Sequence, residues 1–360
     1  MLCPSSSQIY FKCSFRSLNT TTIFRCMELY RARSWALKSL PLALSACKNS
    51  QLKRINMIET EASEETIAEF FGSLNTIHFL TELCVERTYL GIQECEALGN
   101  LLTNSESKLE MLQICEAQLD DERMICLGNV LAVNKTLKYL DLHLNNDSIS
   151  LEGWQGLSQC LRNPDTALET LRFSDSTDAD DEEATDKVAA MVRALEGNST
   201  LKNLNIGCTS YGYDINITEN WVWELFNRVL CDKTSIINTY ASKHTLHSFM
   251  ISGSHWYVQF DKGKYSEVRE SIMYSMNVNL NDDKAEVARE KILKHHFAGE
   301  SAEKFTVFAS MPESVLAHAI AWIGRDKLGH SLMYEFVRTF PHLLSTRIVP
   351  DDAAGKKRKR

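Results

Sequence analysis

The sequence predicts an α/β fold in which strands and helices alternate along a stacked array of repeats. The first observation is a six-residue frame, apolar-x-x-apolar-x-apolar, that recurs along the chain. The second is a change of periodicity within each unit, from the alternation of a half-buried strand to the spacing of a helix. The third is a run of small polar residues at the end of each unit, which favours a turn.

Eight copies of the frame follow one another at nearly regular intervals. Their starts are separated by 28, 28, 29, 28, 31, 33 and 35 residues, and a fixed period of this kind indicates a repeat architecture. The fourth and sixth residues of each copy are expected on the buried face of a strand. The eighth copy is degenerate and starts at Ile236, with Thr239 and Ala241 in place of apolar residues. The other seven begin at Phe24, Leu52, Leu80, Leu109, Leu137, Leu168 and Leu201.

A helical pattern follows the strand frame in each clear unit. Apolar residues three and four apart share a helix face there, and the segments 104–107, 134–136, 163–166 and 197–200 that close the units are rich in turn-forming residues. One strand, one helix and two loops therefore fit within each repeat. The predicted buried helix faces are Leu98, Leu101 and Leu102; Met124, Leu127 and Leu131; and Trp154, Leu157 and Leu161.

This pattern resembles the leucine-rich repeat family, in its long-repeat, ribonuclease-inhibitor-like (RNI-like) class, over about residues 24–245. The resemblance implies a horseshoe-shaped solenoid with parallel strands on its concave face and helices on its convex face. Each unit then buries its apolar face only against its neighbours. We expect Leu83, Leu112, Leu140, Leu171 and Leu204 to be buried in successive parallel strands.

The family pattern also has Asn at the ninth position of each unit, where its side chain bonds to backbone groups of the turn. Here Asn145 alone provides it. Thr or Ser, which stand at this position in other units, can replace the amide in part, whereas Ala cannot. This departure affects the regularity of the turns more than the fold.

The two ends of the chain lack the repeat. Residues 1–23 contain no acidic residue, and a degenerate first unit or a disordered start is favoured over a transit peptide. Residues 246–344 are expected to form a helical cap on the last repeat, with helices at Lys284–Phe297, from Pro312 and from Asp326. Residues 345–360 are expected to be a disordered basic tail.

Two segments lengthen the later units. Asp175–Asp186 holds seven acidic residues in twelve, and Tyr211–Asn220 holds two tyrosines. Insertions in repeat proteins map to loops at one edge, which is often the binding edge. The acidic run fails as a calcium loop, because Glu183 and Ala189 stand where Gly and Glu are required. A solvated loop is favoured, and it competes with the concave face as the main binding surface.

Charge and cysteine content limit the class of protein. The formal net charge is -8, and it becomes -13 without the five basic residues at the C-terminus, so broad binding to nucleic acid or to an anionic membrane is not expected. No apolar run is long enough to span a membrane. The 11 cysteines are odd in number and include no C-x-x-C pair, which favours reduced thiols in an intracellular protein.

The sequence contains no recognisable catalytic motif. Phosphate-binding glycine loops, the G-x-S-x-G elbow and the H-E-x-x-H zinc motif are all missing. His295 and His296 are adjacent, with His318 and His330 further along, but no Cys or paired carboxylate accompanies them, so core or surface histidines are favoured over ligands. Cys84 and Cys115 are expected on the concave side, without a local Cys/His pair to activate them. We expect neither an enzyme nor a cofactor or metal.

The concave face is the predicted binding site. Its side chains come from the third, fifth and seventh positions of each unit, and Met111 and Tyr139 lie near its centre. Aromatic, Met and Arg side chains are typical anchors of protein interfaces. The predicted binding residues are Glu86, Met111, Gln113, Tyr139, Asp141, His143, Arg172, Ser174, Asn203 and Asn205, and Glu28, Arg54, Asn56 and Glu82 share the face.

A non-enzymatic scaffold that binds a protein partner is the leading functional hypothesis, because a solenoid presents a large surface and needs no chemistry. A GTPase-activating protein of the Ran-activating type is an alternative, although that family typically carries an acidic tail and its catalytic arginine matches no position here. The substrate-recognition arm of a ubiquitin ligase is another, although residues 1–23 are too short for an adaptor motif such as an F-box.

The C-terminal tail bears on location. Lys356, Lys357, Arg358, Lys359 and Arg360 form an uninterrupted basic run after a small, flexible spacer. Such runs serve as nuclear import signals or as nucleic-acid contacts, and the acidic body disfavours the second. We therefore expect a cytoplasmic or nuclear protein whose tail can bind an import receptor.

Overall fold

The computed structural model describes residues 10–18, 21–46, 52–145, 149–163, 165–175, 181–208, 220–252 and 266–296. The chain forms two compact units. The first consists of Met1–Leu230 and Lys243–Leu280, and the second of Cys231–Ser242 and Asn281–Arg360. The binding residues predicted for the concave face all belong to the first unit.

The first unit is built on one nine-stranded sheet whose strands follow chain order. β1 (Tyr10–Leu18) pairs antiparallel with β2 (Thr21–Tyr30), and every later pairing is parallel. An α/β fold with a repeat-like parallel sheet is therefore confirmed. The later strands are β3 (Arg54–Ile58), β4 (Glu82–Glu86), β5 (Met111–Cys115), β6 (Tyr139–Leu142), β7 (Thr170–Asp175), β8 (Asn203–Cys208) and β9 (Ser248–Ser252).

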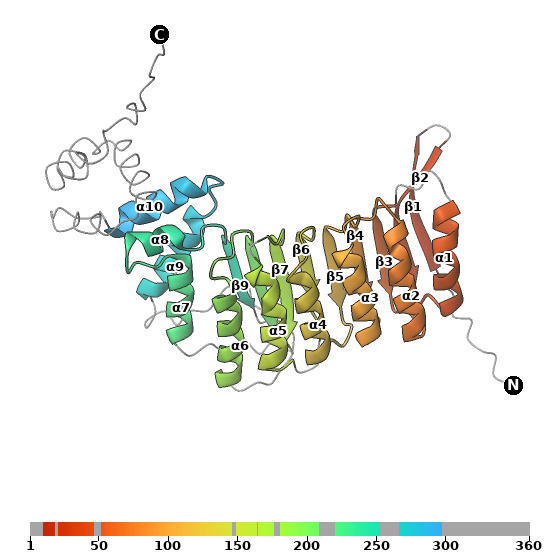
Figure 1. Ribbon diagram of the computed structural model, residues 1–360, viewed down its shortest axis with the longest axis horizontal. Coiled ribbons are helices and arrows are strands. Elements are labelled where there is room, and N and C mark those ends of the chain that lie inside the picture. Colours follow the sequence, from red (N-terminus) through yellow and green to blue (C-terminus); the bar gives the residue numbers. More distant parts are fainter. Residues whose placement is uncertain are drawn as a thin grey trace, which may run out of the picture. The chain divides into compact units, whose positions relative to one another are not determined.

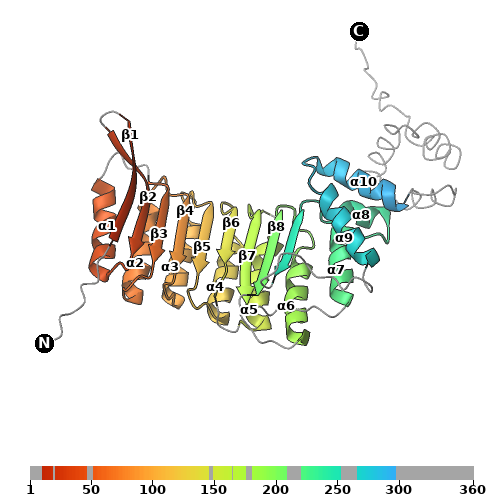
Figure 2. The same cartoon turned by 180° about the vertical axis from the view of Figure 1, so that it is seen from behind.

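Helices cover one face of this sheet, and among the described residues no helix lies on the other face between β3 and β8 (Figures 1 and 2). We call the uncovered side the open face. The helices of the first unit are α1 (Ser34–Ala46), α2 (Glu64–Ser73) with the short 3-10 helix η1 (Leu74–Thr76), α3 (Ile92–Thr103), α4 (Asp121–Leu131), α5 (Leu151–Arg162), α6 (Asp181–Ala194), α7 (Asn220–Leu230) and α9 (Ser266–Val278).

The parallel register aligns the same repeat position on every strand. Leu83 pairs with Leu112, which pairs with Leu140, and the row continues through Leu171 to Leu204. All five leucines are at most 1% exposed, so the predicted buried row is confirmed. The apolar core therefore lies between the sheet and the helices, and it consists mainly of fourth- and sixth-position side chains facing the predicted helix faces.

Helices α4 and α5 approach each other most closely where both lack a side chain. A Cβ added to Gly128 would lie against the carbonyl oxygen of Gly156, and one added to Gly156 would lie 2.8 Å from the Cα of Ile125. Glycine thus allows this approach, which a larger residue would prevent.

Buried asparagine side chains at two places in the repeat form hydrogen bonds with backbone groups of neighbouring repeats. Asn145 follows β6, donates to the carbonyls of Ile114 and Leu142 at 2.8 Å each, and accepts from the Ala117 N–H at 2.8 Å. At the helix ends, Asn134 donates to Leu102 O and Asn198 to Leu161 O, at 2.6 and 2.9 Å. Backbone groups that the turns leave unpaired are satisfied in this way.

Threonine replaces this asparagine only in part, as the sequence suggests. Thr88 Oγ1 accepts from the Thr60 N–H at 3.0 Å and donates to Glu86 O at 3.1 Å. Within the part of the chain that the structure describes, the buried Oγ1 of Thr60 has no hydrogen-bond partner. A hydroxyl reaches fewer backbone groups than an amide because it is shorter and has a single hydrogen.

Three predictions about particular segments are wrong. The eighth repeat frame was predicted at Ile236, but Ile236 starts helix α8 (Ile236–Ala241). The eighth parallel strand is β9, which lies beyond residue 245 and whose repeat frame begins at Leu246. Residues 10–18, expected as a degenerate unit or a disordered start, form strand β1. The acidic segment is not one loop, since Asp181 begins α6.

The second unit contains α8 and α10 (Lys284–His296) among its described residues. Ala288 and Ile292 are buried in α10, as predicted, and His296 Nε2 lies 2.7 Å from Thr239 Oγ1 of α8. The helices predicted from Pro312 and Asp326 and the basic tail lie outside the described residues. Among those that are described, no helix has the length and apolar character needed to cross a membrane.

Candidate functional site

The open face carries the predicted binding residues on β4 to β8 and immediately after β6. The register places Met111 beside Tyr139, Gln113 beside Asp141, and Arg172 beside both Asp141 and Asn205. The backbone of Ser174 belongs to β7, and its side chain lies outside the described residues. The face is therefore continuous, and its centre lies at β5, β6 and β7.

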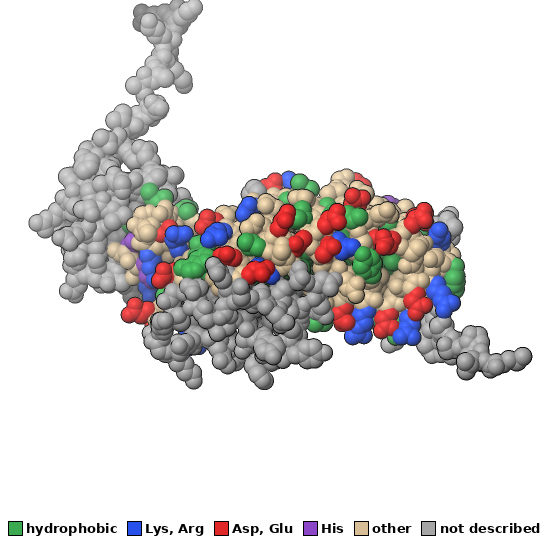
Figure 3. Space-filling model, turned by 90° about the horizontal axis from the view of Figure 1, so that it is seen from below, with side chains coloured by type: hydrophobic (Ala, Val, Ile, Leu, Met, Phe, Trp, Pro, Cys, Tyr) green, Lys and Arg blue, Asp and Glu red, His purple; other side chains and the backbone are tan. Residues whose placement is uncertain are grey.

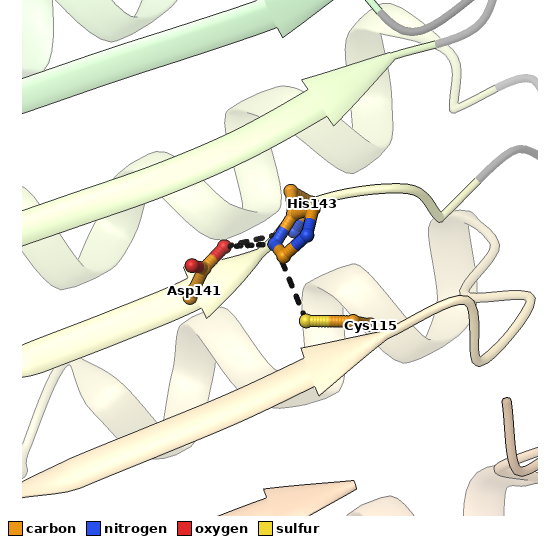
Figure 4. Close-up of side chains that lie close together, drawn as sticks. All are labelled: Cys115, Asp141 and His143. Atoms are coloured by element: carbon orange, nitrogen blue, oxygen red, sulfur yellow. Dashed lines mark hydrogen bonds and ion pairs between the residues drawn. The ribbon is translucent and has the colours of Figure 1, made fainter. Parts of the chain in front are cut away.

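Asp141 is the centre of a hydrogen-bonded group that we call the Asp141 network, formed with Tyr139, His143, Arg172 and Cys115. Its side chain is 0% exposed. Oδ2 accepts from the Tyr139 hydroxyl at 3.0 Å and pairs with Arg172 Nη1 at 3.1 Å. Oδ1 accepts from the His143 backbone N–H at 3.2 Å and lies 2.6 Å from His143 Nδ1 (Figure 4).

The contacts of Asp141 lower its pKa by more than burial raises it. Burial acts to raise the pKa of Asp141, but the hydrogen bond and charge of His143 and the charge of Arg172 hold the pKa below its ordinary value. A carboxylate with donors on both oxygens and a cation at 3.1 Å stays ionised in the interior. The buried Asp141 thus holds the Tyr139 hydroxyl and the Arg172 guanidinium in place. Arg172 also donates to the Tyr139 hydroxyl at 3.2 Å.

Cys115 joins this group across the strands. Its Sγ lies 3.3 Å from His143 Nδ1, and burial, followed by the nearby carboxylate of Asp141, raises the pKa of its thiol. Both Cys115 and Asp141 contact the same ring nitrogen of His143 (Figure 4). A nucleophile–base–orienter triad uses the two ring nitrogens separately, so this geometry does not activate the thiol. Instead, a sulfur, a nitrogen and a carboxylate oxygen converge within 4.8 Å of one another.

The sequence analysis missed the pairing of Cys115 with His143. Both residues stand at the seventh position of adjacent repeats, 28 residues apart. In-register parallel strands bring equal positions side by side. Cys115 and His143 do not lie within one segment, so the signal in the sequence is the equal repeat position of the two residues.

The remaining predicted binding residues lie outside the Asp141 network. Met111 and Gln113 are half-buried on β5, and Asn203 Nδ2 donates to Thr170 Oγ1 at 3.1 Å. The buried Oδ1 of Asn205 has no partner among the described residues. At the end of β4, Oε1 of Glu86 lies 3.9 Å from Nη1 of Arg87.

A row of alternating charges borders the N-terminal part of the face. Arg31, Glu59, Arg87 and Glu116 occupy the eighth position of four successive units, and we call them the charge row. Arg31 pairs with Glu59 at 2.8 Å, Arg87 with Glu59 at 3.8 Å, and Arg87 with Glu116 at 3.1 Å. Acidic and basic side chains are likewise interspersed over the described part of the side seen in Figure 3.

The backbone of the charge row is left-handed. The four residues have φ between 48° and 53°, a region that non-glycine residues seldom adopt. The N–H of Arg31, of Glu59 and of Arg87 donates to the seventh-position carbonyl of the next unit at 2.8, 3.0 and 3.0 Å. These bonds between repeats hold a conformation that would otherwise be strained.

No known protein-family model matches the chain. The chain is similar to three curated proteins of Mus musculus over part of its length. It is 34% identical over 95 residues to NACHT, LRR and PYD domains-containing protein 14, 26% identical over 173 residues to protein 4B of that name, and 28% identical over 130 residues to protein 5. These matches cover 26%, 47% and 36% of this chain and only 9%, 19% and 11% of the relatives.

Proposed function

We propose that this chain is a non-enzymatic interaction scaffold of the RNI-like repeat class, and that it binds a protein partner through the open face. In this proposal the open face is the concave side of the solenoid. The parallel sheet with helices on one face supports the repeat class. The names of the similar mouse proteins, which refer to leucine-rich repeats, support the repeat class independently.

One observation carries the proposal, namely the pre-ordered pair of Tyr139 and Arg172 at the centre of the face. Both side chains are half-buried, and both are held by the fully buried Asp141. Tyr and Arg dominate the binding energy of many protein interfaces. Side chains that are already fixed lose less conformational entropy when a partner binds. The pair therefore has the chemistry and the order of a binding hot spot.

A double substitution, Tyr139→Ala with Arg172→Ala, tests the proposal. A partner is first identified by affinity capture with the full-length chain, and its dissociation constant is then measured with purified proteins. We expect the double variant to bind at least about tenfold more weakly, because a hot-spot residue contributes about 2 kcal/mol or more.

The matched control is a second pair of arginine and aromatic residue on the helical side. Arg193 of α6 lies over the ring of Trp221 of α7 at 5.5 Å. The variant Arg193→Ala with Trp221→Ala removes the same kinds of groups and should bind the partner normally. If the control pair lowers the affinity and the Tyr139 and Arg172 pair leaves it unchanged in a folded protein, the open face is not the binding surface.

We also propose that the basic run Lys356–Arg360 directs the protein to the nucleus through an import receptor. Five cations in succession support it. Deleting residues 356–360 from a fluorescent fusion should shift the fusion towards the cytoplasm. An unchanged distribution, or a full-length fusion already excluded from the nucleus, would contradict the proposal.

A further inference from the structure

We propose that Cys115, Asp141 and His143 form a binding site for a thiophilic divalent cation on the open face, with zinc(II) as the ion that fits best. The site goes beyond the proposed scaffold function and does not require a partner protein. It is built on two adjacent strands, since Cys115 ends β5 while Asp141 lies in β6 and His143 follows it.

The three ligand atoms already have nearly the spacing of a coordination sphere. Zinc binds sulfur at about 2.3 Å and nitrogen or oxygen at about 2.0–2.2 Å, so ligand atoms in a tetrahedral site are roughly 3.3–3.7 Å apart. The Cys115 Sγ to His143 Nδ1 distance is 3.3 Å, and all three atoms lie within 4.8 Å of one another. The 2.6 Å contact of His143 Nδ1 with Asp141 Oδ1 must lengthen by less than about 1 Å, and Cys115 Sγ lies no more than 4.8 Å from the Asp141 ligand oxygen.

The chemistry of the donor set selects among metals. A thiolate is a soft ligand, imidazole is intermediate and a carboxylate is hard, and this mixture suits zinc but not magnesium or calcium, which take oxygen ligands. Three protein ligands leave one position for water or another ligand. His143 is 36% exposed while Asp141 is 0% exposed, so the fourth position faces the open face.

The surroundings position the ligands from behind. Tyr139 and Arg172 bind Oδ2 of Asp141 and leave Oδ1 beside Nδ1 of His143. Hydrogen bonds of this kind orient metal ligands in known sites. Arg172 adds a positive charge, but Asp141 pairs with it, and Glu86 of β4 is the register partner of Cys115 on the other side. On binding, the Cys115 proton leaves to solvent. His143 binds as the neutral imidazole with its hydrogen on Nε2, so any hydrogen on Nδ1 passes to solvent while Nε2 keeps its own or takes one from solvent.

Cobalt(II) is the probe, because it binds zinc sites and gives an absorption band when a thiolate coordinates it. The full-length chain, reduced and stripped of metal, is titrated with cobalt(II) and then with zinc(II). We expect one cobalt per chain, a thiolate-to-cobalt band, and displacement of that band by one equivalent of zinc. Cys115→Ser should abolish the band, and His143→Gln should weaken cobalt binding at least about tenfold, because even residues that only support a ligand cost that much.

Cys84→Ser is the matched control, since Cys84 is a half-buried thiol on the same face one strand away. It should leave the band and the affinity unchanged. His143 is partly exposed, so His143→Gln keeps the test valid if Cys115→Ser does not fold. The proposal is overturned if the folded wild-type chain takes up no stoichiometric cobalt, or if Cys84→Ser lowers binding as much as His143→Gln does. In that case the three residues form a hydrogen-bonded cluster only.

Discussion

The Asp141 network and the charge row are both products of in-register stacking, yet they differ in burial. Each places ionisable side chains of neighbouring repeats next to one another. In the network the central carboxylate is fully buried and has donors on both oxygens. In the charge row Arg31 and Arg87 are 46% and 50% exposed at their side chains, and the acids beside them are also in contact with water.

This difference shows that stacking decides which side chains come into contact, while burial decides how much each contact contributes to the free energy of unfolding. Exposed ion pairs typically contribute between about zero and 1 kcal/mol, because water screens them and long side chains must be ordered. A buried carboxylate is different because removing it leaves several donors unpaired. The two regions should therefore respond very differently to equivalent substitutions.

Replacing the buried carboxylate should have the largest effect. Asp141→Ala leaves the Tyr139 hydroxyl, the His143 groups and Arg172 without their shared acceptor, and we expect a loss of about 2–3 kcal/mol. Urea unfolding followed by circular dichroism measures it. Asp141→Asn keeps the size and one acceptor oxygen and should lose less. Equal losses for the two variants would mean that packing, and not hydrogen bonding, is what Asp141 provides.

The ninth-position turns extend the same comparison. Asn145→Ala removes three buried hydrogen bonds, so we expect a loss of about 2 kcal/mol. Thr88→Ala removes two and leaves less backbone unpaired, so about 1 kcal/mol is expected. Chemical denaturation of both variants measures the two values. If Thr88→Ala costs as much as Asn145→Ala, threonine replaces the family's asparagine fully and our reading of the turns is wrong.

Acid should weaken the network selectively. Because the folded pKa of Asp141 is lower than its unfolded value, the native state binds fewer protons, and the contribution of Asp141 is present above the unfolded pKa of about 3.9. This contribution to the free energy of unfolding is lost as the pH falls through the pKa that Asp141 has in the folded protein. The effect should be smaller than that of Asp141→Ala, since the protonated side chain keeps its volume and part of its hydrogen bonding.

The pH dependence is measured as unfolding free energy between about pH 2 and pH 5, in metal-free buffer. Asp141→Asn should flatten the acid limb of the wild-type curve. Superimposable wild-type and variant curves would show that Asp141 is not held ionised by its neighbours.

The charge row should be the least sensitive region. Arg87 contacts Glu59 and Glu116, yet we expect Arg87→Gln to leave the free energy of unfolding almost unchanged, because water and salt screen these exposed pairs. A double-mutant cycle with Glu116→Gln measures the coupling directly. A coupling that is clearly measurable and persists at high salt would remove the contrast between the two regions.

The fold was largely predictable because a repeat supplies the same signal many times. The frame around Leu140 predicts a buried strand, and its equivalents in four other units predict the same. The frame at Leu246 was missed because the preceding insertion shifts it out of the regular spacing, and Ile236, at the expected distance, belongs to a helix. A spacing rule fails where a unit has gained residues.

The candidate site was predictable in outline only. Positions three, five and seven identify Tyr139, Asp141 and Arg172 as residues of one face. The sequence does not show that Asp141 becomes fully buried there, because its neighbours, and not its own strand position, cover it. It also leaves the partner of Cys115 undetermined until equal positions of adjacent repeats are compared.

The alternating signs of the charge row also bear on how such an array can lengthen or shorten. Arg31, Glu59, Arg87 and Glu116 repeat their charge pattern every second unit, whereas the fold repeats every unit. Loss of the single unit that carries Glu59 would preserve the strand stacking but bring Arg31 next to Arg87, two like charges side by side. Loss or duplication of two adjacent units would preserve both. For this edge of the molecule the smallest electrostatically neutral building block is therefore a pair of repeats.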